Sequence, residues 1–202
     1  MADDFAIVVE GLSSLRDIEN LPPRIIRAAR AAVNKTVDFG RADSARMIRR
    51  EVAFPARYLS GKNGRLAITK RAQGKDLEGV ITGRARPTSL ARFSRGSPES
   101  TRRRKGVTVT VKPGTPRFMA KAFLMRLRAG TAGLDTKHNL GLAVRLKPGE
   151  TIRNKRIQVS QWKGLTFLYG PSVDQVFDDV AEQNSGNLAE YLEREFNRLL
   201  EL

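Results

Sequence analysis

Residues 22–52 read PPRIIRAARAAVNKTVDFGRADSARMIRREV, and the pattern of apolar residues in this stretch decides the fold. Apolar and small residues recur at steps of three or four, which places them on one face of an α-helix. This face consists of Ile26, Ala29, Val33, Val37, Gly40, Ser44, Ile48 and Val52. The two prolines at the start suit a first helical turn, where a missing N–H group costs nothing. We therefore expect one long N-terminal helix from about Pro22 to Val52, with a bend at Gly40.

After this helix the sequence changes to the two-residue period that is typical of β-strands. The clearest case is Val107, Val109 and Val111, which alternate with threonines. Strands are predicted at residues 65–69, 77–82, 107–111, 123–127 and 142–146. Turns rich in Gly and Pro are predicted at residues 73–75, 112–114 and 147–149. The middle of the chain should therefore form a small, mostly antiparallel sheet.

The C-terminal part of the chain returns to a helical pattern. Ser172 and Gln175 have the spacing of a capping box, which marks a helix start. The polar stretch 184–187 is expected to break this helix, and Asn187 with Glu190 can cap a second one. The buried side of the pair should consist of Val173, Val176, Phe177, Val180, Leu188, Leu192, Phe196 and Leu199. The predicted fold class is α+β, with one long N-terminal helix, a small mostly antiparallel β-sheet and a C-terminal helical pair in a single domain over residues 1–202.

The net charge of +16 is unevenly distributed along the chain. Residues 1–20 carry −4, residues 21–163 carry +26, and residues 164–202 carry −6. A chain polarised in this way favours two kinds of partner, a polyanion that faces the basic middle and a second copy of the chain.

The densest basic stretch is residues 84–105, which hold eight Lys and Arg against one acid, Glu99. Its basic residues are Arg84, Arg86, Arg92, Arg95, Arg102, Arg103, Arg104 and Lys105. The stretch has too little apolar surface to offset the entropy of ordering it, so a flexible basic arm is expected. The arm can contact DNA phosphates without sequence preference, it can pair with acidic surfaces of neighbouring subunits, or it can be a solvated charged loop. The residues leave these alternatives open.

The residues that usually carry chemistry are scarce. The chain has no cysteine, and His138, its only histidine, lies in a polar stretch that reads as a loop. Asp174, Asp178 and Asp179 are the one carboxylate cluster worth considering, but a negative charge in a first helical turn has a structural role. No catalytic residue, metal site or cofactor is therefore expected. No apolar run of about 18 residues predicts a membrane span, and the acidic start does not read as a signal peptide.

Six short stretches occur in the order in which the phage minor tail protein Z family, also called tail completion proteins, has similar ones. They are residues 32–36, 84–93, 106–109, 121–124, 141–145 and 168–173, within a resemblance that covers roughly residues 15–200. The resemblance implies a virion protein of the tail or neck, made in the host cytoplasm. It would complete the tail and help join it to the head around the DNA channel. The family has no catalytic residues.

The partners expected from this resemblance are further copies of the chain in a ring, other neck and tail subunits, and packaged DNA without sequence preference. A tail-terminator or connector ring protein is the alternative within the same class. A free, non-specific nucleic-acid-binding protein is the alternative from another class, and an enzyme is the third and weakest hypothesis.

Overall fold

The computed structural model describes residues 5–7, 21–60, 64–96, 106–127, 140–152 and 154–201. The helices are α2 (Pro23–Glu51), α3 (Ala56–Ser60), α5 (Val173–Leu200) and the 3-10 helix η1 (Leu90–Phe93). The strands are β1 (Phe5–Ile7), β2 (Leu66–Lys70), β3 (Gly79–Gly83), β4 (Thr88–Ser89), β5 (Gly106–Val109), β6 (Arg117–Ala120), β7 (Phe123–Arg126), β8 (Leu140–Val144), β9 (Gln158–Trp162) and β10 (Leu165–Gly170). Every strand pairing within these residues is antiparallel, so the α+β class is confirmed.

The chain divides into two compact units, where the sequence predicts a single domain. Unit 1 comprises Met1–Ile48, Ala56–Ala85 and Val173–Leu202. Unit 2 comprises Arg49–Pro55 and Arg86–Ser172. The chain passes between the units four times, so neither unit is a continuous segment. Reading the sequence in order cannot reveal such a division, because each unit builds its core from segments that are far apart in the chain.

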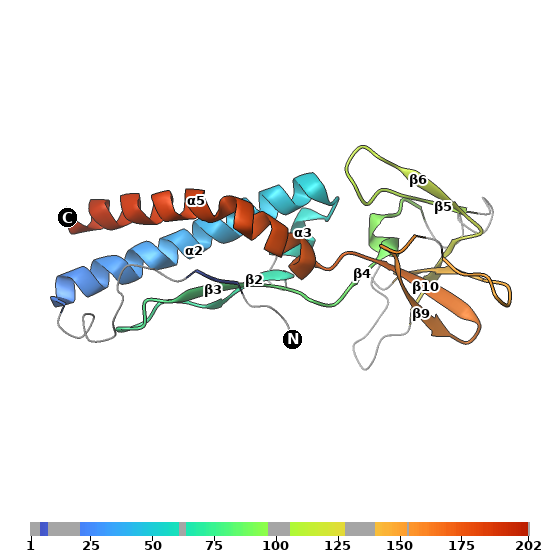
Figure 1. Ribbon diagram of the computed structural model, residues 1–202, viewed down its shortest axis with the longest axis horizontal. Helices are drawn as coiled ribbons and strands as arrows, with labels where there is room; N and C mark the ends of the chain where they lie inside the picture. The colour runs from blue at the N-terminus through green and yellow to red at the C-terminus, as the bar shows by residue number, and fades with distance from the viewer. Residues whose placement is uncertain are drawn as a thin grey trace. The chain divides into compact units, whose positions relative to one another are not determined.

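Unit 1 is a two-layer structure in which α2 and α5 lie side by side above a three-stranded sheet of order β1-β3-β2 (Figure 1). The predicted apolar face of α2 is confirmed from Val33 onward, because Val33, Val37 and Ile48 are each at most 1% exposed. A Cβ atom added at Gly79 of β3 would lie 2.2 Å from Val37 Cγ2. The backbone of β3 therefore rests directly on α2.

The two long helices are antiparallel and pack through a small residue. A Cβ atom added at Gly40 of α2 would lie 3.0 Å from Leu188 Cδ2 of α5. Beside this contact, the rings of Phe39 of α2 and Tyr191 of α5 stack with centroids 4.3 Å apart. The bend expected at Gly40 stays a prediction; α2 is continuous through this residue, and the missing side chain allows close approach of α5.

The C-terminal helical pair of the sequence prediction is one continuous helix, α5, of 28 residues. The polar residues that were expected to break it bond within the helix. The Ser185 hydroxyl donates to the Glu182 carbonyl oxygen (2.9 Å), and Asn187 Nδ2 donates to Asn184 Oδ1 (3.2 Å). Asn184 and Leu188 are buried, at 0% and 7% exposure. Packing of this segment outweighs weak helix propensities, which are worth at most about 1 kcal/mol per residue.

Unit 2 is built from β-strands. Its larger sheet has five strands: β4, β10, β8 and β7 follow one another in that order, and β9 also pairs with β10. Strands β5 and β6 pair with each other in a separate two-stranded sheet. Its core is aliphatic and aromatic. The most buried members are Leu90, Phe93, Val107, Val109, Ala122, Leu124, Leu142, Ala143 and Leu168. The turns predicted at 112–114 and 147–149 are present, closed by N–H bonds from Thr115 to Lys112 O and from Glu150 to Lys147 O.

The first part of the predicted flexible arm, residues 84–96, is folded. It contains β4 and η1, in which Leu90 and Phe93 are 2% and 5% exposed. The Phe93 ring lies 5.2 Å from that of Phe54, and the Phe93 carbonyl accepts a hydrogen bond from Thr110 N (2.9 Å). The prediction of a flexible arm gave too little weight to these two apolar residues, because basic residues surround them in the sequence. Residues 97–105 lie outside the described residues.

Candidate functional site

Unit 2 carries the entire excess of positive charge. It contains 21 Lys and Arg against four Asp and Glu, a balance of +17. Unit 1 contains 16 basic against 17 acidic residues, a balance of −1. Four carboxylates can neutralise only a small part of the cations in unit 2. The blocks seen along the sequence therefore translate into one nearly neutral unit and one strongly cationic unit.

The structure describes four of the eight predicted arm residues, and these four do not all belong to one unit. Arg84 belongs to unit 1, where its N–H donates to Arg65 O (2.9 Å) and its carbonyl accepts from Asp174 N (3.3 Å). Arg86, Arg92 and Arg95 belong to unit 2, and Arg86 and Arg95 are exposed. The remaining four, Arg102, Arg103, Arg104 and Lys105, lie outside the described residues. Arg84 thus has a place in the structure of unit 1, while its neighbours join the charge of unit 2.

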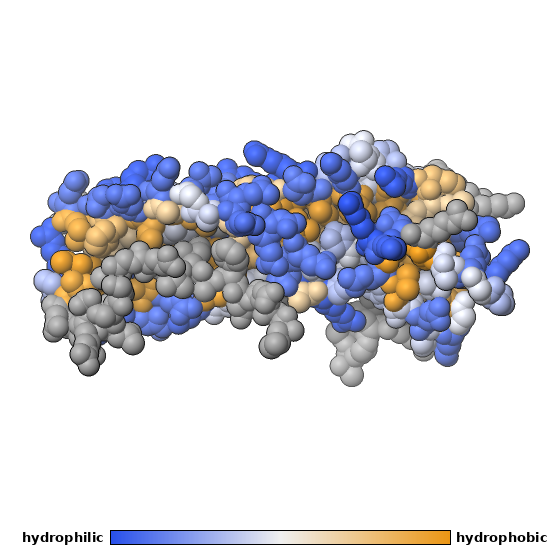
Figure 2. Space-filling view, viewed as in Figure 1, coloured by the Kyte–Doolittle hydropathy of each residue, from blue (hydrophilic) through white to orange (hydrophobic). Residues whose placement is uncertain are grey.

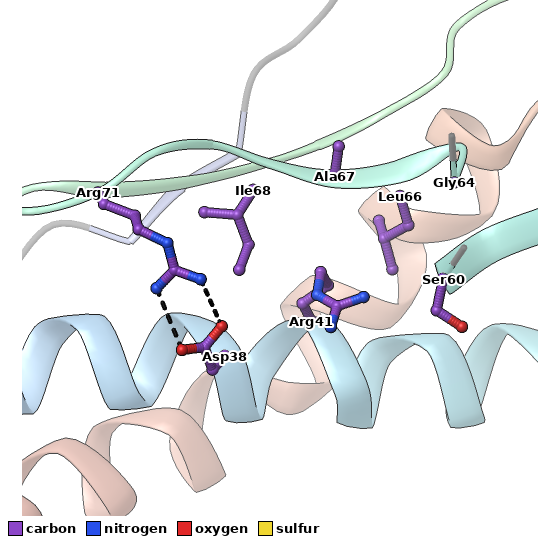
Figure 3. Close-up of a pocket in the computed structure, with 8 residues that line it drawn as sticks. All are labelled: Asp38, Arg41, Ser60, Gly64, Leu66, Ala67, Ile68 and Arg71. Atoms are coloured by element: carbon purple, nitrogen blue, oxygen red, sulfur yellow. Dashed lines mark hydrogen bonds and ion pairs between the residues drawn. The ribbon is translucent and has the colours of Figure 1, made fainter. Parts of the chain in front are cut away.

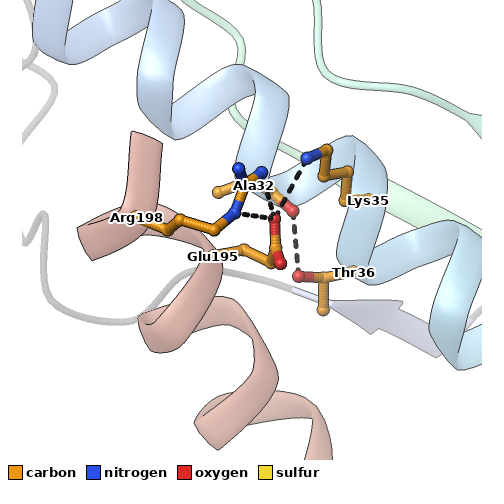
Figure 4. Close-up of polar contacts among 5 residues, drawn as sticks. All are labelled: Ala32, Lys35, Thr36, Glu195 and Arg198. Atoms are coloured by element: carbon orange, nitrogen blue, oxygen red, sulfur yellow. Dashed lines mark hydrogen bonds and ion pairs between the residues drawn. The ribbon is translucent and has the colours of Figure 1, made fainter. Parts of the chain in front are cut away.

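Charged side chains in unit 1 join its two long helices. Glu195 of α5 accepts hydrogen bonds from Lys35 of α2 (3.1 Å) and from Arg198 (2.9 Å), as Figure 4 shows. The hydrogen bond from Arg198, and then that from Lys35, hold the pKa of the Glu195 carboxyl below its ordinary value. Near the ends of the same helices, Arg24 donates to the Leu200 carbonyl oxygen. Several charges of unit 1 are therefore used in internal contacts. In Figure 2 its visible face is hydrophilic along the helices, with apolar residues showing between them.

Unit 1 also contains a surface cleft of about 380 Å³ between α2 and β2. Figure 3 shows Asp38 and Arg71 facing each other at one end of the cleft and Ser60 at the other, with Arg41 between them. Arg71 donates two hydrogen bonds to Asp38, of 2.6 and 3.1 Å, and these hold the Asp38 pKa below its ordinary value. Ser60 donates to Ala56 O (3.1 Å). The Asp38 carboxylate and the Ser60 hydroxyl are therefore both used in structural hydrogen bonds. The pair of Asp38 and Arg71 joins α2 to the residue that follows β2.

The carboxylates considered as metal ligands occupy a structural position. Asp174 is 8% exposed in the first turn of α5, and its N–H donates to the carbonyl oxygen of Arg84, the residue after β3. A Cβ atom added at Gly83 would lie 2.7 Å from the Asp174 Cα atom, so the backbones of strand and helix meet directly there. Within the described ranges, no group of three or more His, Asp or Glu side chains could hold a metal ion. His138 is outside those ranges.

One feature of unit 2 was missed by the sequence reading, namely a hairpin with an exposed tryptophan. Trp162, the single tryptophan of the chain, ends β9 and is 55% exposed. The two residues that connect β9 to β10 are Lys163 and Gly164, with φ angles of 48° and 72°. This is the geometry of a tight type I′ turn. The sequence held only a weak signal for this hairpin, because Gly164 suits a tight turn but Lys-Gly is not among the pairs that mark a hairpin most strongly.

Comparison of the chain with family models, with curated proteins and with solved structures gave no significant match. Among the helices that the structure describes, none combines the length and the apolar character needed to cross a lipid bilayer.

Proposed function

We propose that the chain is a structural virion protein of a phage neck or tail, a ring-forming subunit that completes the tail and helps join it to the head around the DNA channel. The observation that carries the proposal is the separation of charge, with +17 on unit 2 and −1 on unit 1. The resemblance of six ordered stretches to tail completion proteins supplies the biological context. The role of tail terminator or connector ring protein is the nearest alternative.

The two units suit two different tasks. The long helices of unit 1 are tied by internal ion pairs and apolar contacts, which makes a firm frame for contacts with neighbouring subunits. Unit 2 has few carboxylates to compensate its cations, so a phosphate backbone is a favourable partner for it. Such binding needs no reading of bases, as a protein that surrounds DNA of any sequence requires.

The charge of residues 102–105 gives the proposal a direct test. Replacing Arg102, Arg103, Arg104 and Lys105 by Gln should leave the stability of the subunit nearly unchanged, because the sequence predicts a solvated arm there and exposed charges contribute little to stability. Particles should assemble in normal numbers but should fail to retain DNA. Counting assembled particles and then measuring their DNA content separates these two effects.

A control variant removes the same charge from unit 1. Arg27, Arg57, Arg65 and Lys75 are exposed there, and their replacement by Gln should leave DNA retention unchanged. Failed assembly of the first variant would instead show that residues 102–105 join subunits to one another. Equal DNA loss in both variants would contradict a special role for unit 2.

A free nucleic-acid-binding protein is the second candidate, because the charge of unit 2 would serve it equally well. The two candidates differ in assembly. A protein that remains a monomer in size-exclusion chromatography and binds DNA tightly across a salt series would support the free binder and contradict the ring.

A further inference from the structure

The β9–β10 hairpin places an aromatic ring at the surface of the cationic unit. Within the described residues β9 pairs only with β10, and all five of its residues are exposed. Trp162 is paired with Leu165 directly at the turn. A two-residue turn holds these positions firmly, so the indole stands at a fixed place on the surface. An exposed tryptophan in a fixed position calls for a binding partner, because burial of its ring is strongly favourable.

The surroundings of Trp162 indicate the chemistry of that partner. Successive residues of a strand point to opposite faces, so on β9 Trp162 shares its face with Gln158 and Ser160. Val159, the other exposed apolar residue of this strand, points to the opposite face. The two therefore do not join into one apolar patch of the kind that marks a protein interface. Across the strand pair, Trp162 faces the half-buried Leu165 on the same side of the sheet. A ring between an apolar neighbour and hydrogen-bonding side chains suits a flat partner with polar edges.

One cation lies beside the ring and two more lie beyond the other end of β9. Lys163 Nζ is 4.9 Å from the centre of the Trp162 ring. Lys155 and Arg156 precede β9 in an exposed turn, roughly 20 Å from Trp162 along the extended strand. Glu150, the nearest carboxylate that precedes the hairpin in the sequence, accepts a hydrogen bond from Lys147 N (3.0 Å) in its own turn. A flat aromatic ring with adjacent cations is the combination with which proteins hold single-stranded nucleic acid, by base stacking and phosphate contact.

We propose that the β9–β10 hairpin of unit 2 binds single-stranded nucleic acid, with a base stacked on Trp162 and phosphates near Lys163 and Arg156. An unpaired base is needed, because the bases of a duplex are stacked on one another and cannot also stack on the indole. This inference goes beyond the proposed function, since a ring subunit and a free binder could both use the hairpin. The hairpin proposal can therefore be refuted while the ring-forming function is supported, and the ring can be refuted while the hairpin proposal is supported.

The single tryptophan makes the test specific, because all tryptophan fluorescence of the full-length protein comes from this hairpin. Titration with a dT12 oligonucleotide at low salt should quench the fluorescence in a saturable way and should protect the ring from iodide. A 12-base-pair duplex should bind through charge with little change in fluorescence. The iodide measurement needs no variant and therefore does not depend on how any variant folds.

Variants then separate stacking from charge. Trp162→Ala should lower the affinity for dT12, measured with a labelled oligonucleotide, by about 5- to 150-fold at an unchanged salt slope. Trp162→Phe should restore much of that affinity. Lys163→Asn keeps a favourable turn and should reduce the salt slope by about 0.7. Phe118, which is 61% exposed on β6, offers the matched control, and Phe118→Ala should bind like the original protein.

Three results would overturn the proposal. The first is binding of dT12 with unchanged fluorescence and with equal affinity for Trp162→Ala, which would place the oligonucleotide elsewhere. The second is equal quenching by duplex and single strand. The third is no binding of dT12 at low salt together with a fluorescence change that follows protein concentration, which would make the hairpin a contact between subunits.

Discussion

Gly186 offers a sharp test of the continuous α5 helix. It is exposed, and a Cβ atom added there would meet nothing within 4 Å. Glycine inside a helix costs roughly 0.5–1 kcal/mol relative to alanine. With no steric cost to set against this gain, Gly186→Ala should stabilise unit 1 by about 0.5–1 kcal/mol. The midpoint of thermal unfolding, followed by circular dichroism, should rise by about 1–4 °C.

A second glycine of unit 1 provides the control. Gly74 is equally open, but its φ angle of 57° lies in the left-handed region. An alanine there is strained, so Gly74→Ala should destabilise the unit by about 1 kcal/mol although it also meets no neighbour. If Gly186→Ala were neutral or destabilising like Gly74→Ala, residues 184–187 would form a break and the continuous helix would be refuted.

Three further predictions concern the packing and charge of the long helices. Leu188→Ala should cost about 2–5 kcal/mol in urea unfolding, because Leu188 is 7% exposed against α2; a loss below 1 kcal/mol would contradict this helix contact. Ser172 directly precedes α5 and is 1% exposed, so Ser172→Ala should lower the unfolding free energy by about 0.5–2 kcal/mol, and an unchanged melting temperature would show that it does not cap the helix. The pKa of Glu195 is held below its ordinary value of 4.5, so its contribution is present above that pH and is lost as the pH falls through the lower folded-state pKa. Glu195→Gln should therefore be less stable at pH 7 with a difference that shrinks below pH 4, and a pH-independent difference would contradict the assignment.

Local patterns in the sequence were sufficient for much of the fold. The face of α2 that contains Val33 and Val37 follows from helical spacing alone. The start of α5 after Ser172 and the turns around Gly114 and Gly149 follow from capping and turn residues, whose effect is local. These features depend on residues a few positions apart, and the structure contains each of them.

Long-range packing decided what the sequence could not predict. The helix break expected near Asn187 is absent, because α2, some 150 residues away in the chain, packs against this segment. The anchoring of η1 depends on Phe93 meeting Phe54, a contact that no local pattern reveals. The concentration of charge in unit 2 required knowing which segments fold together. The β9–β10 hairpin could have been suspected from Gly164 between two strand-like segments. No role was predicted for Trp162, because no known motif surrounds it.

Cross-linking of this subunit in purified particles tests the central claim most directly. The account predicts a ladder of products in which the subunit is joined to itself, from dimers up to a closed ring of defined size. Products that join the subunit only to other proteins, with a single copy in each particle, would contradict it.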